Sequence, residues 1–137
     1  MYRGYRPKVL VVDDVAPQRL ILKHGLSLHG LDVTAAADGF EALRILHDGV
    51  LHEEAIEMGV VDHGMPEMSG TELVMRIRQD PSIADLPVIM LTARAFELDE
   101  DELRETLGIL RVLPKPFSPR EIADIIHATL AEQPTAA

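Results

Sequence analysis

Five short apolar runs alternate along this chain with five segments of helical periodicity. The strand-like runs cover about residues 8–12, 31–36, 58–62, 87–91 and 109–113, and the helical patterns cover about 16–29, 40–48, 69–79, 96–107 and 119–131. Strands that alternate with helices form βα units, which build a parallel sheet with helices on both faces. We therefore predict an α/β fold, a doubly wound (βα)5 three-layer sandwich around one five-stranded parallel sheet.

Polar side chains stand where four of the predicted strands end. Asp13 and Asp14 close the first apolar run, and Asp62 closes the third. The fourth run ends in Thr92, and the fifth ends in Lys115. The carboxyl ends of parallel strands lie at one edge of an α/β sheet, and ligands bind at that edge. These five residues therefore predict a single site.

The carboxylates also select the order of the strands. Asp13, Asp14 and Asp62 converge only if the first and third strands are neighbours. Right-handed crossovers leave few other arrangements. The predicted order is 2-1-3-4-5, which is the flavodoxin-like order, with the site at its topological switch point.

Three carboxylates in one place require a cation. At separations of about 4 Å, two carboxylates repel each other by roughly 4 kcal/mol at an effective dielectric near 20. Lys115 alone does not offset three of them. A set of hard oxygen ligands with water suits Mg²⁺, for which Mn²⁺ can substitute. This combination predicts a site for Mg²⁺-assisted phosphoryl transfer.

Composition excludes several classes of protein. The chain has 137 residues, of which 47% are hydrophobic, and this fits one domain with a single core. It has no cysteine, a polar and basic beginning, and no apolar stretch of membrane-spanning length, so we expect a cytoplasmic protein without a membrane partner. The net charge of −10 argues against direct nucleic-acid binding by this domain. A basic or mixed protein surface is the expected partner.

Four short motifs resemble the receiver domain of two-component response regulators, in the CheY-like superfamily. They are Val11-Val12-Asp13-Asp14, Asp62-His63-Gly64-Met65-Pro66 with Ser69-Gly70, Leu91-Thr92-Ala93, and Pro114-Lys115-Pro116-Phe117. The resemblance covers about residues 7–131. It leaves residues 1–6 as an N-terminal extension and residues 132–137 as a C-terminal tail or linker. It implies a signalling phosphoacceptor that catalyses only its own phosphorylation and dephosphorylation.

The resemblance also implies the acceptor and the metal ligands. Asp62 would take a phosphoryl group from a sensor histidine kinase or a histidine phosphotransfer protein. Asp14 would bind Mg²⁺ directly, and Asp13 would bind it mainly through water. Asp62 and the backbone carbonyl of Gly64 would complete the protein ligands.

The same resemblance assigns the switching residues. Lys115 would pair with the acceptor before transfer and with a phosphoryl oxygen after it, and Thr92 would move its hydroxyl onto another oxygen. Val112 replaces the usual aromatic residue three positions before the lysine, so no ring can report phosphorylation there. Gly64 and Arg94 occupy the pair of positions that in this family tunes the access of water. The signal would pass to a downstream protein or output domain through the fourth helix, fifth strand and fifth helix.

Each of these residues also has an ordinary structural explanation. Asp13 and Asp14 are good helix N-caps, Asp62 precedes a turn-forming glycine, and Thr92 can cap a following segment. Lys115 can be a solvated loop charge. The acidic segment 97–105 is either a partner surface or a solvated helix face, and solvation is favoured. The five residues come from four separate motifs. Their convergence on one edge of the sheet argues against four unrelated structural explanations.

Two functional alternatives remain at this point. A phosphohydrolase of the haloacid-dehalogenase type also forms an aspartyl phosphate on an α/β sheet, but it expects a second aspartate two residues after the nucleophile. Gly64 stands at that position. A pseudo-receiver would signal without phosphate, and it is disfavoured because all five site residues are present.

Overall fold

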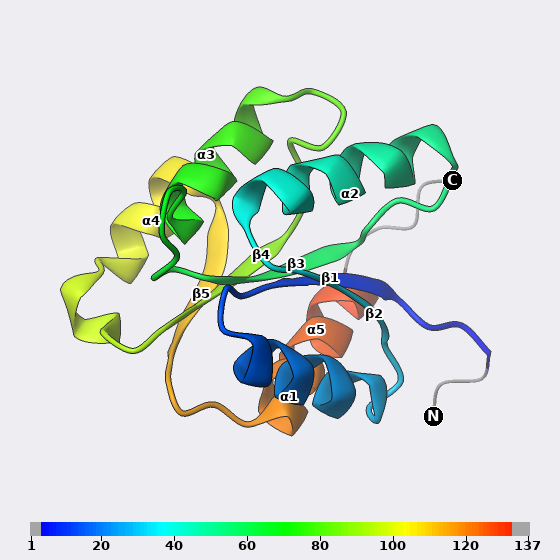
Figure 1. Ribbon diagram of the computed structural model, residues 1–137, viewed down its shortest axis with the longest axis horizontal. Coiled ribbons are helices and arrows are strands. Elements are labelled where there is room, and N and C mark those ends of the chain that lie inside the picture. Colours follow the sequence, from blue (N-terminus) through cyan, green and yellow to red (C-terminus); the bar gives the residue numbers. More distant parts are fainter. Residues whose placement is uncertain (1–3, 133–137) are drawn as a thin grey trace.

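A five-stranded parallel sheet forms the middle layer of the protein (Figure 1). The computed structural model describes residues 4–132. The strands are β1 (Lys8–Val12), β2 (Asp32–Ala36), β3 (Met58–Asp62), β4 (Val88–Thr92) and β5 (Ile109–Pro114). Their order is β2-β1-β3-β4-β5, and every neighbouring pair is parallel. The predicted fold class and strand order are confirmed.

Helices cover both faces of this sheet. One face carries α1 (Ala16–Ser27) and α5 (Pro119–Glu132), and the other carries α2 (Gly39–Leu51), α3 (Gly70–Gln79) and α4 (Glu100–Leu107), as Figure 1 shows. A short 3-10 helix, η1 (Ala95–Glu97), precedes α4. Among residues 4–132, no helix combines the length and the apolar character that a membrane crossing requires.

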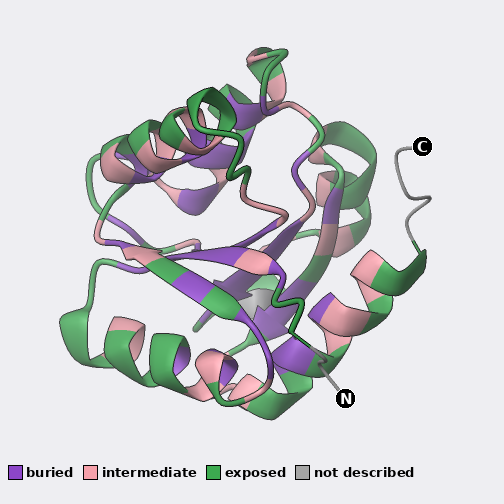
Figure 2. Ribbon diagram, turned by 90° about the vertical axis from the view of Figure 1, so that its right-hand side faces the viewer, coloured by how far each residue is buried: buried purple, intermediate pink, exposed green. Residues whose placement is uncertain are grey.

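The central strands are apolar on both faces because each face meets a layer of helices. β3 and β4 are buried along their whole length, and the strands lie between helices with exposed outer surfaces in Figure 2. In β1, Leu10 and Val12 face the core under α2, α3 and α4, whereas Val9 and Val11 face the core under α1 and α5. Continuous apolar runs of this kind are typical of parallel sheets.

Side-chain caps mark the starts of four helices, α2, α3, α4 and α5, where the α5 cap is Ser118, which accepts from the Glu121 amide. Asp38 accepts from the Glu41 amide at the start of α2, and Ser69 accepts from the Glu72 amide at the start of α3. Asp99 does the same for α4. Oxygen side chains at this position satisfy amides that have no partner within the helix. The Asp99 cap explains why the predicted helix 96–107 is interrupted, with η1 before the cap and α4 after it.

Other boundaries differ from the predictions by a few residues. The second helix continues past the predicted end at 48 to Leu51, and α5 reaches Glu132. Part of the predicted N-terminal extension packs on the domain, because the Tyr5 hydroxyl donates to the Glu57 carboxylate and Arg6 donates to the Ser27 carbonyl. Residues 1–3 of that extension and residues 133–137 of the predicted tail lie outside the described residues.

Gly70 allows the first turn of α3 to lie against the end of β3. A Cβ atom at position 70 would lie 2.7 Å from the carbonyl oxygen of Asp62 and 2.8 Å from Cα of His63. Because both neighbours are backbone atoms, we expect Gly70→Ala to lower the free energy of unfolding by about 1–3 kcal/mol. Urea denaturation would measure it. Gly64→Ala is the matched control, because a Cβ there meets nothing within 4 Å.

For Gly64→Ala the expected change is within about 0.5 kcal/mol. Equal stability of the two variants would contradict the proposed close approach at position 70.

Candidate functional site

Three aspartates meet at the carboxyl ends of β1 and β3. The two strands are paired, with Val12 beside Val61, so the residues that follow them are brought together. One carboxylate oxygen each from Asp13, Asp14 and Asp62 lies within 4.8 Å of the others. Asp13 and Asp62 are buried, whereas Asp14 is exposed. The structure thus brings together the carboxylates that the sequence placed at one edge.

Lys115 is the cation of this cluster. It directly follows β5, and its amide donates to the carbonyl oxygen of Thr92 at the end of β4. Its ammonium nitrogen lies 3.1 Å from Asp62 Oδ1 and 4.0 Å from Asp13 Oδ2. The side chain is only 18% exposed, and the Lys115-Pro116 bond is cis. Lys115 is therefore part of the site and not a solvated loop charge.

Asp13 is held in an electrostatically unfavourable position. Burial raises the pKa of its carboxyl above the ordinary value, and the charges of Asp62 and Asp14 raise it further. The Val15 amide, which donates to Asp13 Oδ1, and the charge of Lys115 act in the opposite direction. The other oxygen, Oδ2, is buried and has no hydrogen-bond partner among the described residues.

An unpartnered buried carboxylate oxygen beside two further carboxylates fits a divalent cation. Burial of an unpaired charged oxygen is costly, and one lysine does not balance three carboxylates. Aspartate and carbonyl oxygens are the hard ligands that Mg²⁺ prefers. The residues present therefore fit the metal that the sequence predicted.

The structure does not support the capping explanation for the first two aspartates. The N-cap position of α1 is Val15, and no side-chain hydrogen bond caps this helix. Asp13 accepts from the Val15 amide at 2.9 Å, which leaves its second oxygen for the cluster.

An open cavity of about 300 Å³ lies over the cluster. Its lining includes Asp14, Gln18, Asp62, His63, Gly64, Thr92, Arg94, Glu97, Leu98 and Lys115. No Cβ stands at Gly64, and the Arg94 side chain is directed toward Glu97, with 3.4 Å between Nη1 and Oε1. The cavity is thus wide enough for a small phosphorylated group beside Asp62.

Thr92 lines the cavity, whereas Val112 lies in the core. Thr92 is buried at the end of β4, and its hydroxyl oxygen accepts from the Arg94 amide at 3.1 Å. Val112 on β5 pairs with Met90 and is buried in the core that Leu103 and Leu107 of α4 cover. The predicted local cap by Thr92 is present, and it keeps the hydroxyl beside the loop that leads to α4.

Several contacts at the site were not predicted. Gln18 accepts from Lys115 at 2.8 Å, and Arg19 donates to the backbone carbonyl of Asp13 at 2.7 Å. His63 is half-buried and lies 3.0 Å from the Thr71 hydroxyl. One signal for Gln18 was available in the sequence, because it lies in the first turn of the helix that follows Asp13 and Asp14.

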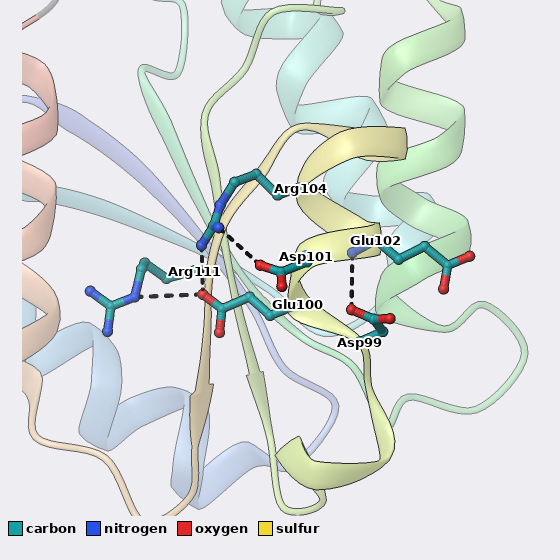
Figure 3. A network of polar contacts seen from close by, with 6 residues as sticks. All are labelled: Asp99, Glu100, Asp101, Glu102, Arg104 and Arg111. Carbon is teal, nitrogen blue, oxygen red and sulfur yellow. Dashed lines mark hydrogen bonds and ion pairs between the residues drawn. The ribbon is translucent and has the colours of Figure 1, made fainter.

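Two carboxylates of the acidic segment before β5 form ion pairs on the surface of α4 (Figure 3). The Glu100 carboxylate lies 2.9 Å from Arg104 and 3.8 Å from Arg111 of β5, and Asp101 also contacts Arg104. No residue of α4 is fully buried. Exposed ion pairs contribute little to stability, so α4 is held mainly by its partly buried leucines.

The orphaned oxygen of Asp13 predicts a specific response to metal. In chelator, Asp13→Asn should unfold at higher urea concentration than the wild type, because it removes a buried charge. Free Mg²⁺ at about 100 times its dissociation constant should stabilise the wild type by about 2.7 kcal/mol and the variant by less. Asp124→Asn, at an exposed position on α5, is the control and should respond as the wild type does.

The sign of the pH dependence follows from the raised pKa of Asp13. The folded protein binds the proton of the Asp13 carboxyl more tightly than the unfolded chain does. The metal-free wild type therefore loses stability as the pH rises from 3.8 through the raised pKa of Asp13 in the folded state. The difference between wild type and Asp13→Asn should therefore vanish below pH 3.8. A difference that persists at low pH would contradict the electrostatic explanation.

Comparison with known proteins agrees with this geometry. The family model described as response regulator receiver domain matches residues 9–127. The transcriptional regulatory protein CpxR of Escherichia coli strain K12 is 39% identical over 123 residues, which cover 90% of this chain and 49% of CpxR. This chain spans about half the length of the curated relatives that it matches.

Solved structures of response regulator proteins superpose on about nine-tenths of this chain. Chemotaxis protein CheY4 of Vibrio cholerae is 29% identical with a TM-score of 0.74, covering 90% of this chain and 98% of that one. A response regulator receiver domain protein of Clostridium thermocellum is 26% identical with a TM-score of 0.78, covering 91% and 94%. The chain belongs to the response regulator receiver domain family, a family of signalling domains.

Proposed function

We propose that Asp62 accepts a phosphoryl group from a phosphohistidine on a sensor kinase or a histidine phosphotransfer protein. The observation that carries this proposal is the pairing of Asp62 with Lys115 at 3.1 Å, beside two further carboxylates and under an open cavity. The domain, residues 7–131, then signals to a downstream protein or output domain. Its family membership supports a signalling role.

In the proposed reaction, a carboxylate oxygen of Asp62 attacks the phosphorus atom. An O–P bond forms while the P–N bond of the donor breaks. The electron pair of that bond goes to the ring nitrogen, which leaves as neutral imidazole when the other ring nitrogen carries a proton. A strand-end carboxylate is a suitable nucleophile for covalent capture of this kind.

The other residues of the site orient the Asp62 carboxylate and help to neutralise negative charge. Asp13, Asp14, Asp62 and the backbone carbonyl of Gly64 would hold Mg²⁺. When bound, this ion supplies positive charge that neutralises the phosphoryl oxygens during transfer. Lys115 keeps the Asp62 carboxylate oriented before transfer and donates to a phosphoryl oxygen afterwards.

Gly64 and Arg94 are the proposed determinants of phosphoryl lifetime. Gly64 places no side chain over Asp62, and Arg94 lies at the opposite wall of the cavity, paired with Glu97. Gly64 also stands where a haloacid-dehalogenase-type phosphohydrolase requires its second aspartate. This departure supports a phosphoacceptor and not an enzyme that turns over small phosphate esters.

Thr92 is the proposed trigger of the conformational switch. Its hydroxyl now contacts the Arg94 amide, at the start of the loop that leads through η1 to α4. Moving the hydroxyl toward a phosphoryl oxygen would pull this loop inward. Because α4 has no fully buried residue, a small change in the loop can shift its position. The face of α4, β5 and α5 would present the change to the partner.

Asp62→Asn should abolish labelling by acetyl phosphate, phosphoramidate or a phosphohistidine donor in the presence of Mg²⁺. Amides are poor nucleophiles, and no other carboxylate ends β3. Mass spectrometry of the labelled protein measures the outcome. Asp124→Asn should be labelled as the wild type is. An Asp62→Asn protein that still gains an acid-labile phosphate would refute the assignment.

Beryllofluoride with Mg²⁺ stands in for the phosphoryl group and tests the switch. We expect amide chemical shifts to change most in residues 92–112. Thr92→Ala should remove most of that change while Asp62 stays phosphorylatable, because the hydroxyl is not needed for attack. Thr106→Ala, on the exposed side of α4, is the control. Changes confined to Asp13, Asp14 and Asp62 would show that the loop does not transmit the signal.

A further inference from the structure

The Lys115 ammonium group lies among three oxygen atoms from three different residues. It donates to Gln18 Oε1 at 2.8 Å, lies 3.1 Å from Asp62 Oδ1, and lies 4.0 Å from Asp13 Oδ2. We propose that Gln18 is a positioning residue, which holds Lys115 beside Asp62 and keeps it from pairing fully with Asp13. This proposal rests on the proposed function of Asp62.

Gln18 can act in this way because its own position is fixed. It stands in the first part of α1, is half-buried, and lines the same cavity as Asp62 and Lys115. The next residue, Arg19, donates to the backbone carbonyl of Asp13 at 2.7 Å and ties the helix to the loop after β1. The backbone of Lys115 is tied in turn to Thr92. Both partners of the hydrogen bond are therefore anchored.

Asp13 Oδ2 is a strong alternative partner for the Lys115 ammonium group. Asp13 Oδ2 is buried, has no hydrogen-bond partner among residues 4–132, and lies 4.0 Å from the ammonium nitrogen. A lysine side chain is long and flexible, and a hydrogen bond to a carboxylate is stronger than one to an amide. Without Gln18, the pairing with Asp62 is the remaining contact in this cluster that opposes movement of Lys115 toward Asp13. That movement would withdraw the cation from Asp62 and place it on an oxygen of the metal cluster.

The chemistry of an amide suits this task. Glutamine offers an acceptor oxygen without adding a fourth negative charge to the cluster. An ammonium group has three N–H donors. Gln18 takes one of them, and Asp62 lies 3.1 Å away as an ion-pair partner, so a donor remains for a phosphoryl oxygen. Lys115 can therefore engage the phosphoryl group while Gln18 still holds it.

Two consequences separate this role from a merely structural one. Removing the acceptor should slow phosphorylation of Asp62, because its lysine partner is no longer held in place. It should also weaken binding of Mg²⁺ in the absence of any phosphoryl donor, because Lys115 then competes for Asp13. Neither effect requires a change in the free energy of unfolding.

The test compares Gln18→Met, which keeps the length of the side chain and removes the acceptor, with Gln79→Met. Gln79 is exposed at the end of α3 and is not among the residues that line the cavity, so it is the matched control. Labelling by phosphoramidate with Mg²⁺ should slow by about tenfold in Gln18→Met and should not change in Gln79→Met. Gln18→Asn keeps the amide but is too short to reach, and it should behave as Gln18→Met does.

Three further measurements assign the effect to Lys115. Calorimetric titration with Mg²⁺ alone should show weaker binding in Gln18→Met, and the NMR signal of the Lys115 ammonium group should shift. In a Lys115→Met background, Gln18→Met should have no further effect on the labelling rate, since the two residues act as a pair. Unchanged metal binding, or rate effects that multiply independently, would overturn the proposal.

The outcomes also distinguish this proposal from the proposed function. If the wild type takes no label while Asp62→Asn behaves identically, the proposed function fails. The ammonium signal and the titration would still report on Gln18 in that case. If the wild type is labelled on Asp62 and Gln18→Met is labelled at the same rate, only the positioning role is refuted.

Discussion

Repulsion among three carboxylates at the ends of β1 and β3 is the constraint on which this site depends. Burial raises the pKa of the Asp13 carboxyl and leaves its Oδ2 atom without a hydrogen-bond partner among the described residues. Asp14 is exposed to solvent. The sheet must hold these groups together against their mutual repulsion, and paired, fully buried strands can do so because their register is fixed by both cores. Local instability of this kind is typical of functional sites in otherwise stable domains.

The strands, their order in the sheet and the site residues at the strand ends could be predicted from the sequence. Apolar runs gave the strands, and the aspartates at their ends required β1 and β3 to be neighbours, which set the strand order. Asp62, Thr92 and Lys115 could be placed at the site for the same reason, since each directly follows or ends a strand. Such residues are positioned by the backbone of the sheet and need no knowledge of side-chain packing.

The parts that the sequence did not predict depend on side chains meeting across the fold. Gln18 and Lys115 are 97 residues apart, and their contact follows from the way α1 packs beside the end of β5. The division of the helix at 96–107 follows from a single cap, Asp99, inside an acidic run in which several residues are equally good candidates. Apolar periodicity carries no information on either point.

In the proposed switch, the weakly attached helix α4 would carry the signal from the site without a rotating aromatic ring. Val112 is small and buried, so this position of β5 offers no aromatic ring that can alternate between two positions. Instead, the loop after Thr92 leads directly into η1 and then into α4. The surface ion pairs of α4, one of which joins Glu100 to Arg111 of β5, are exposed and individually weak. In the proposed switch, a change at Thr92 would act on the backbone that precedes α4. The small free energy that holds this helix would then set how far the helix moves.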